Sequence, residues 1–232
     1  MAAITISRGQ RFKLTDMIST DHEFQLGITA KISGLAVDFS CFGLDANGRL
    51  SDDRYMTFFN QPATPCGGVS LTTPAGDSSG FAIALQKLPT TIHRLTVTAA
   101  IDGNGLMSQF NDGYIRFILK GVEVARFSFT GGDFSAERAL ILLEIYRKDG
   151  IWRVAASGQG FNGGLDTLVK HFGGTVKEPN PNISLSPYSP VALSNSRKIY
   201  QFTLKSPINL SLIHISEPTR RTPISYAVFC LK

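Results

Sequence analysis

The sequence predicts an all-β fold, an antiparallel β-sandwich that carries one short helix near the end of the domain. Three observations favour this class. Short apolar segments that alternate with polar residues recur along the chain, which is the pattern of half-buried strands. Gly is frequent, with 22 residues in 232, and turn residues separate the segments. Charged residues make up 18% of the chain, below the usual ~25%, which favours a β-rich domain over a helical bundle.

The strands follow from this alternation, taken in chain order. In the first clear segment, Phe24, Leu26 and Ile28 fall on one face. The predicted strands cover residues 22–32, 35–41, 95–101, 114–119, 122–129, 139–146 and 151–155. Hairpin turns are predicted at Lys120-Gly121 and Asp149-Gly150, because such dipeptides adopt the positive φ angles of a two-residue turn.

One helix is predicted after the last strand. Leu165, Leu168, Val169 and Phe172 recur at i, i+3, i+4 and i+7, and Gly173 follows as a stop. We expect this helix to lay its single apolar stripe on the sandwich.

Three segments of the chain are predicted to differ in kind. Residues 1–176 form the sandwich domain. Residues 177–209 are rich in Pro, Asn and Ser and predict an extended linker. An echo of the N-terminal pattern within residues 183–193 leaves open the start of a second, truncated module. Residues 210–232 resemble the translation of a sequencing adapter, so we expect a non-native tail and a natural protein that continues differently after residue 209.

Charge and cysteine content point to the cytoplasm and away from nucleic acid. The net charge is +5, but residues 210–232 contribute +2 and the remaining cations form no clustered run. No secretory signal and no apolar run of ~18 residues is present, so we expect no membrane span. Cys41, Cys66 and Cys230 lack metal-type spacing and are expected to be inert thiols in a reducing compartment.

Catalytic patterns are weak in this sequence. His22, His93 and His171 fall in different predicted elements, and no nucleophile elbow or paired metal-binding motif accompanies them. We therefore expect no enzymatic activity.

Residues 158–163 match the G-x-G-x-x-G pattern of dinucleotide-binding loops. That loop requires a parallel βαβ unit and an acidic residue ~20 residues further on. Here the preceding strand is the second arm of a hairpin, and Glu178 lies in the predicted linker. A Gly-rich corner between strand and helix is the favoured interpretation, and nucleotide binding is a minor alternative.

Acidic and amide side chains gather in predicted turns and at strand ends. They are Asp38, Asp45, Asn47, Asp52, Asp53, Asn60, Asp77 and Asp102. Calcium takes six to eight oxygen ligands of this kind, but solvated turn acids have the same spacing, so both interpretations stay open. The segment that begins at Asp45 superficially resembles an EF-hand loop, yet it lacks the final Glu, and Asn47-Gly48 is the better match to a hairpin turn.

Residues 139–174 resemble the C-terminal signature of the TerD-like tellurium-resistance and stress-protein family, with its E-x-Y-R, W and A-x-G-Q-G-[FY]-x-G-G-L elements. Upstream, residues 37–40 are similar to the D-x-D-x-S strand and residues 51–60 to the S-D-x-x-F-V-F-Y-N segment. Residues 4–14 are similar to the K-G-Q-x-x-x-L opening. The resemblance implies a calcium-binding β-sandwich without established enzymatic chemistry, found in bacterial tellurite and stress resistance. It also implies partners among other resistance proteins near the inner membrane.

Carried over by position, the resemblance implies four metal ligands: Asp38, Asp52, Asn60 and Asp77. Three departures weaken the set. Ala36 stands at the first acid of D-x-D, and Ser78 and Ser79 replace the Asp and Glu that follow in G-D-D-E. Fewer carboxylates lower calcium affinity, so we expect one weak site or none, as in a diverged, TerA-like branch.

Two functional hypotheses follow. The first is a non-enzymatic stress-resistance protein that binds calcium weakly and acts through protein partners. The alternative is a metal-free interaction scaffold.

Overall fold

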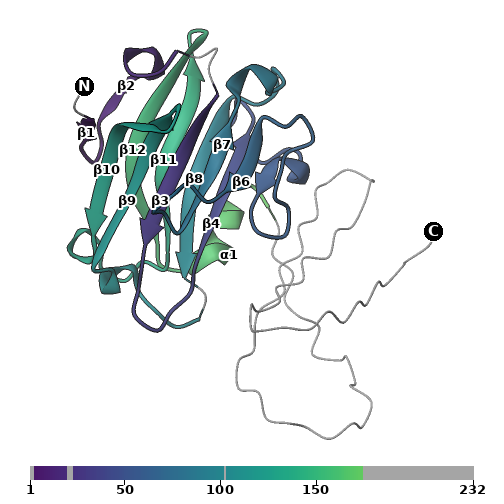
Figure 1. The fold of residues 1–232 in the computed structure, drawn as a ribbon. Coiled ribbons are helices and arrows are strands. Elements are labelled where there is room, and N and C mark those ends of the chain that lie inside the picture. The colour runs from purple at the N-terminus through teal and green to yellow at the C-terminus, as the bar shows by residue number, and fades with distance from the viewer. Residues whose placement is uncertain (1–2, 20–22, 102, 175–232) are drawn as a thin grey trace, which may run out of the picture.

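Two six-stranded sheets packed face to face form the fold in the computed structural model, which describes residues 3–19, 23–101 and 103–174 (Figure 1). Sheet A has the order β1-β10-β9-β3-β7-β6, and sheet B has the order β2-β12-β11-β8-β4-β5. One helix, α1 (Gly164–His171), follows the last strand. The predicted all-β sandwich with one short helix is confirmed.

The strands of sheet A are, in sheet order, β1 (Ile4–Ile6), β10 (Val122–Thr130), β9 (Asp112–Leu119), β3 (Phe24–Ala30), β7 (Ser79–Ile83) and β6 (Val69–Thr72). Those of sheet B are β2 (Arg11–Lys13), β12 (Ile151–Phe161), β11 (Ala139–Lys148), β8 (Arg94–Ile101), β4 (Val37–Leu44) and β5 (Met56–Thr57). Short 3₁₀ turns lie at Leu14–Asp16, Asp53–Tyr55, Leu85–Lys87, Met107–Gln109 and Gly131–Asp133.

Strand pairing is antiparallel except at one edge. There β1 runs parallel to β10, with Ile6 opposite Phe127. This pair departs from the purely antiparallel arrangement that the sequence predicts. Both side chains are buried in the interior, so the short N-terminal strand closes the end of the core although no hairpin connects it to its neighbour.

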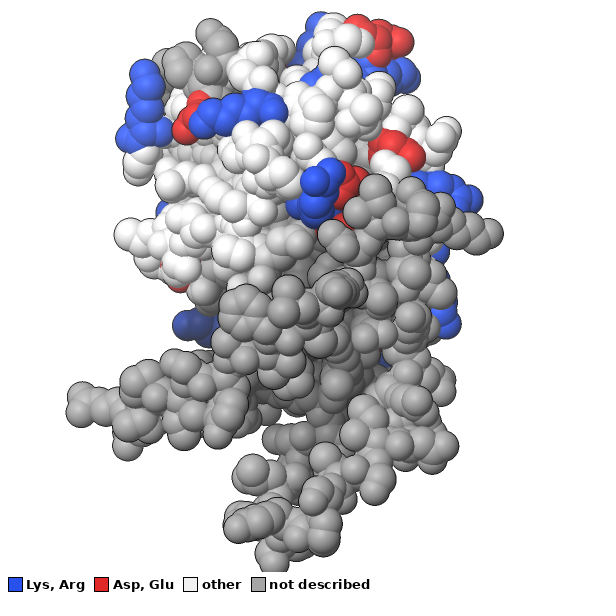
Figure 2. Space-filling model, turned by 90° about the vertical axis from the view of Figure 1, so that its right-hand side faces the viewer, with Lys and Arg blue, Asp and Glu red and all other residues white. Residues whose placement is uncertain are grey.

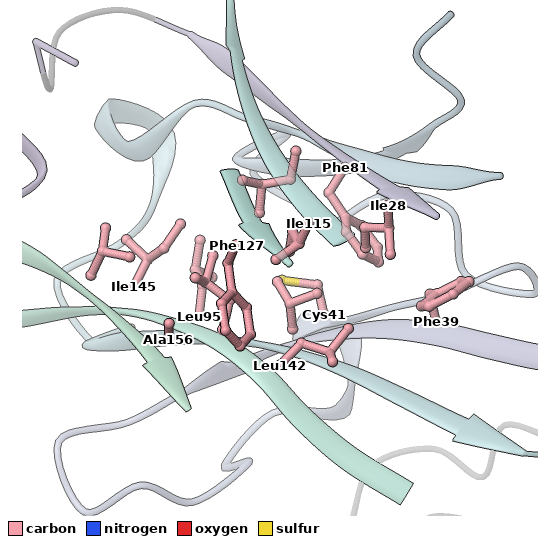
Figure 3. Close-up of a cluster of buried hydrophobic side chains, with 14 of the residues drawn as sticks. Ile28, Phe39, Cys41, Phe81, Leu95, Ile115, Phe127, Leu142, Ile145 and Ala156 are labelled. Atoms are coloured by element: carbon pink, nitrogen blue, oxygen red, sulfur yellow. The ribbon is translucent and has the colours of Figure 1, made fainter. Parts of the chain in front are cut away.

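The core between the sheets follows from the alternation in the sequence. Phe24, Leu26 and Ile28 are buried on the inner face of β3, as predicted. Figure 3 shows side chains of both sheets meeting there, with Ile115 and Phe127 facing strands of sheet B. Each fully buried side chain of this size contributes about 1.5–3 kcal/mol to stability.

Both predicted hairpin turns are present. Lys120 and Gly121 have φ angles of 50° and 79° between β9 and β10. Asp149 and Gly150 have φ angles of 53° and 76° between β11 and β12. Two successive positive φ angles define the type I′ turn, whose twist matches that of the flanking strands.

Part of the outer face of sheet B is covered by α1, as predicted. Leu168 and Val169 are buried in one cluster with side chains of β4, β8, β11 and β12, and the rings of Phe42 and Phe172 lie 4.8 Å apart. The helix ends at His171 with Phe172 as its C-cap, after which Gly173 has a φ of 81° and the amide of Gly174 donates to the carbonyl of Val169. This end matches a glycine C-cap.

Strand β12 is longer than predicted. It runs to Phe161 rather than ending at Ala155, and Gly158 and Gly160 therefore lie inside the strand. The predicted corner between strand and helix is limited to Gly163, which precedes α1. The expectation of a Gly-rich corner over the whole motif was wrong, because the ladder with β11 continues past the glycines to Ala139 opposite Phe161.

The predicted linker at residues 177–209 and the predicted tail at residues 210–232 lie outside the described residues. In the part of the chain that the structure describes, no helix is long and apolar enough to cross a membrane. On the face shown in Figure 2, Lys and Arg side chains mostly lie beside Asp and Glu side chains, and most of the described surface is neutral.

Candidate functional site

Asp77, one of the four predicted metal ligands, lies in the loop between β6 and β7, on the outer face of sheet A. Gly27 and Gly80 face each other across β3 and β7 beneath this loop. A Cβ atom on Gly27 would lie 1.9 Å from the Asp77 carboxylate, and one on Gly80 would lie 2.1 Å from the Leu26 carbonyl of β3 and 2.8 Å from the Pro74 ring. The two glycines therefore let the loop settle on the sheet, and the Asp77 side chain is 0% exposed there.

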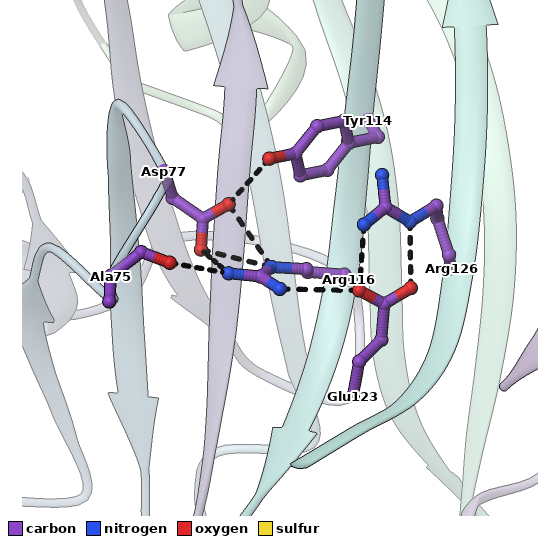
Figure 4. Close-up of polar contacts among 6 residues, drawn as sticks. All are labelled: Ala75, Asp77, Tyr114, Arg116, Glu123 and Arg126. Carbon is purple, nitrogen blue, oxygen red and sulfur yellow. Dashed lines mark hydrogen bonds and ion pairs between the residues drawn. The ribbon is translucent and has the colours of Figure 1, made fainter. Parts of the chain in front are cut away.

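The Asp77 carboxylate is fully engaged by its neighbours on β9 (Figure 4). Arg116 Nε donates to both carboxylate oxygens at 3.1 Å, and its Nη2 donates to Oδ2 at 2.9 Å. Tyr114 donates its hydroxyl to Oδ1 at 2.9 Å. The same Nη2 donates to the carbonyl of Ala75 at 2.8 Å, which ties the loop backbone to the guanidinium.

The contacts continue around a closed ring of five side chains, which we call the ionic ring: Asp77, Tyr114, Arg116, Glu123 and Arg126. Arg116 Nη1 lies 3.2 Å from Glu123 Oε2. Arg126 donates to both Glu123 oxygens at 2.7 Å, and its guanidinium stacks 4.0 Å from the centre of the Tyr114 ring. Two carboxylates and two guanidinium groups make the ring neutral.

A β-bulge in β10 builds this ring. Glu123 and Arg126 are three residues apart, so a regular strand would place them on opposite faces. The register shifts between Glu123 and Ala125, with Glu123 opposite Ile118 and Arg126 opposite Arg116. The extra residue brings both side chains to the outer face, which is the usual effect of a bulge.

The ring favours its charged form. Hydrogen bonds from Arg126 lower the pKa of Glu123, and those from Arg116 add to this effect against the cost of burial. The pKa of Arg116 is raised, chiefly by its hydrogen bonds to Asp77. A guanidinium bound to two carboxylates in a partly buried site therefore stays protonated.

The other three predicted ligands lie elsewhere. Asp38 faces Ala100 on the outer face of sheet B, so both sheets separate it from Asp77. Asp52 caps a 3₁₀ turn and accepts bonds from the Arg54 backbone and guanidinium, whose side-chain bonds lower its pKa. Asn60 lies in the turn between the bridged residues Phe58 and Gln61.

The structure thus does not gather the predicted ligands around one point. Stacked sheets lie ~10 Å apart, whereas calcium ligands lie ~2.3–2.6 Å from the ion, so Asp38 and Asp77 cannot share one ion. Within residues 3–19, 23–101 and 103–174, no group of three or more His, Cys, Asp or Glu side chains could hold a metal ion.

The glycine motif is occupied by the chain's own side chains. Arg8 donates to the Gly158 carbonyl at 2.5 Å, and its guanidinium lies 5.4 Å from the centre of the Phe134 ring. A Cβ on Gly160 would collide with the Glu137 side chain. The glycines therefore make room for Arg8 and Glu137 within an antiparallel sheet, and that arrangement differs from a dinucleotide-binding loop.

Titratable groups considered for catalysis are dispersed. His171 contacts the rings of Phe161 and Phe172, with centroids 5.2 and 5.3 Å away. Cys41 lies in the core, where burial raises the pKa of its thiol to about 12. Such a thiol is a poor nucleophile, because the thiolate is the reactive form. His22 and Cys230 lie outside the described residues.

Four of the five ring residues, all except Asp77, were not predicted from the sequence. Tyr114 and Arg116 stand at the outward positions of a predicted alternating strand. Two outward polar side chains at such positions were a sequence signal for pairing with an acid. The role of Glu123 could not be predicted, because the bulge that turns its side chain outward leaves no clear mark in the alternation of the sequence.

Fold and site together define a class: a two-layer β-sandwich protein whose outer face is organised by a neutral ionic ring. The TerD domain model matches residues 1–172, and the chain belongs to the TerD family of tellurium-resistance and stress proteins.

Relatives of this chain include proteins with tellurium-resistance names. The chain is 31% identical over 189 residues to the uncharacterized protein YceE of Bacillus subtilis, which covers 74% of this chain and 98% of that protein. It is 30% identical over 149 residues to the tellurium resistance protein TerD of Serratia marcescens, covering 59% of this chain and 77% of the relative. It is 33% identical over 131 residues to the tellurium resistance protein TerA of an Alcaligenes species, covering 54% of this chain and 37% of the relative.

A solved structure supports the fold. The homologue of telluride resistance protein TerD from Streptomyces coelicolor superposes with a TM-score of 0.50 at 16% identity. The match covers 63% of this chain and 94% of that one. At this identity the likeness concerns the fold alone.

Proposed function

We propose that this chain is a non-enzymatic stress-resistance module that acts in the cytoplasm through protein partners and needs no calcium to organise its outer face. Partners among other tellurite- and stress-resistance proteins, peripheral to the inner membrane, are part of the proposal. Family membership supports the resistance role. The hydrogen bonds that the Asp77 carboxylate already accepts support the part of the proposal that calcium is not needed.

The donor set at Asp77 does not fit calcium. Both carboxylate oxygens already accept hydrogen bonds from Arg116, and one also accepts from Tyr114. A calcium ion requires several oxygen ligands at ~2.3–2.6 Å and would have to displace the guanidinium. Ser78 and Ser79 offer no carboxylate to compensate. The cation that neutralises Asp77 is therefore a side chain of this protein.

A calcium titration of unfolding tests the metal part of the proposal. The midpoint of thermal unfolding of the full chain is measured in chelator and then in rising calcium, with magnesium as the control. We expect no calcium-specific rise. Selective binding at ~100 times the dissociation constant would add about 2.7 kcal/mol and several degrees.

Weak calcium binding is the competing hypothesis, and the variants Asp38→Ala and Asp77→Asn separate the two. A calcium-specific rise that either substitution abolishes would establish the metal site and contradict our proposal.

The partner role is tested by crosslinking in bacterial cells exposed to tellurite. We expect the wild-type chain to capture the same partner protein with and without a chelator. A chain that captures no protein under stress would contradict the proposal.

A further inference from the structure

The outer face of sheet B carries a second charged surface, beside the part that α1 covers. Lys13, Arg153, Tyr146 and Arg94 are register partners on the four consecutive strands β2, β12, β11 and β8. Neighbouring strands lie ~4.8 Å apart, so this row spans about 14 Å. With the flanking cations it forms what we call the basic face: Arg11, Lys13, Arg94, Lys148 and Arg153.

These side chains point away from the core. Their neighbours Trp152, Val154 and Ile145 are buried between the sheets, so the alternate positions face outward. Lys13, Arg11 and Lys148 are exposed, and Arg94 and Arg153 are half-buried.

Among the described residues, only one carboxylate pairs with the basic face. Glu144 accepts a hydrogen bond from Arg94 at 2.6 Å. Asp16 accepts from the backbone amide of Lys13 rather than from its ammonium group. Among residues 3–19, 23–101 and 103–174, the side chains of Arg11, Lys13, Lys148 and Arg153 form no ion pair. Sheet A differs, because there each guanidinium of the ionic ring has a carboxylate.

The excess of positive charge is confined to the basic face. Residues 175–232 hold seven of the 23 Lys and Arg residues and two of the 18 Asp and Glu residues, which leaves residues 1–174 with zero formal net charge. A domain without net charge generates little long-range attraction for a long polyanion. A short row of cations around a tyrosine, with the exposed Ile151 at its border, has the mixed composition of a protein interface.

We infer that the basic face is a docking surface for an acidic segment of a partner protein. The inference rests on the proposed function, because it names the chemistry of the partner through which the module acts. Glu and Asp side chains of such a segment would pair with Lys13 and Arg153, beside the Tyr146 ring, which already has the Arg94 guanidinium 5.6 Å from its centre.

Binding of a defined probe tests the surface. A fluorescein-labelled peptide of ten Glu residues is titrated with the full chain by fluorescence anisotropy at low and high salt. The variant K13Q/R153Q should bind about five-fold more weakly, as expected for the loss of two solvent-accessible charge pairs. The variant E144Q should bind about two-fold more tightly, because it removes the acid that neutralises Arg94.

Two matched controls remove the same charge elsewhere. K31Q/K120Q removes two exposed cations outside the basic face, and R197Q/K198Q removes two cations outside the described residues. Both should bind the peptide as the wild type does. Equal weakening by a control, loss confined to R197Q/K198Q, or no binding by the wild type would overturn the inference. Unfolding midpoints check that each variant folds, and the single variant K13Q replaces the double variant if it does not.

Other polyanions decide the class of partner. A labelled oligomer of ten thymidine nucleotides and vesicles containing phosphatidylserine are titrated in parallel. Tighter binding of either one than of the peptide, with the same sensitivity to K13Q/R153Q, would overturn the assignment to a protein segment.

The crosslinking experiment separates the two proposals. If K13Q/R153Q captures the partner as well as the wild type does, the docking surface is wrong while the proposed function stands. If the wild type captures no partner, the proposed function fails, and the peptide titration still decides whether the surface binds acidic chains.

Discussion

Removal of the Arg116 guanidinium is the sharpest test of the ionic ring. In Arg116→Met the Asp77 carboxylate, whose side chain is 0% exposed, loses its cation and keeps only the Tyr114 hydroxyl. Breaking a buried ion pair on one side costs about 3–5 kcal/mol, because the remaining charge is buried without compensation. Arg116 itself is 18% exposed, so we expect a loss near the lower end, about 3 kcal/mol.

A double-mutant cycle measures the interaction itself. Asp77→Asn removes the charge, and the combined variant Arg116→Met/Asp77→Asn should be more stable than the sum of the two losses predicts. Coupling between contacting residues of this kind is about 0.5–3 kcal/mol. Urea unfolding of the four proteins gives the free energies. For a domain of this size, 3 kcal/mol corresponds to a fall in midpoint of about 6–12 °C.

The cycle has a clear negative outcome. Additive losses, or a loss below about 1 kcal/mol for Arg116→Met, would show that solvent screens Asp77. Either result would refute the claim that Arg116 is the cation that neutralises Asp77. Arg54→Met is the matched control, because its exposed pair with Asp52 should leave the unfolding midpoint unchanged.

Three further predictions follow from the described contacts. Gly27→Ala places a Cβ atom against the Asp77 carboxylate and should lower the free energy of unfolding in urea by about 1–3 kcal/mol. An unchanged free energy would show that the loop between β6 and β7 moves away from the sheet without cost. Leu168→Ala, at the centre of the contact between α1 and sheet B, should cost about 2–5 kcal/mol, whereas a substitution of exposed Lys170 should have little effect. Because the pKa of Glu123 is lowered by Arg126 and Arg116, its stabilisation is present above its unfolded-state pKa and is lost as pH falls through the folded-state pKa. Glu123→Gln should therefore flatten the loss of stability on acidification below about pH 4.5, and an unchanged pH profile would contradict the assignment.

The ionic ring and the basic face give the two sheets different roles. On sheet A every charge of the ring is neutralised within the fold, and the loop between β6 and β7 is held down by Arg116. On sheet B the covered half packs against α1, and the other half presents cations to solvent. This contrast is the basis for assigning stability to the first surface and recognition to the second.

Local pattern determined much of the fold. Alternation placed the strands and their buried faces, as in β3, because successive side chains of a strand point to opposite sides. Lys120-Gly121 and Asp149-Gly150 determined two hairpins through their positive φ angles. The spacing of Leu165, Leu168, Val169 and Phe172 determined a helix and its buried stripe. Strands β1, β2, β5, β6 and β7 were not predicted, because runs of two to five residues carry little periodicity.

Only the tertiary structure decided what the charged residues do. The sequence singled out Asp77 as an acid in a turn, but its pairing with Arg116 depends on how β3, β7 and β9 lie side by side. The bulge in β10 turned Glu123 outward, and strand register aligned Lys13 with Arg153. Charges interact across strands that are distant in the chain, so their partners are set by register and not by local spacing.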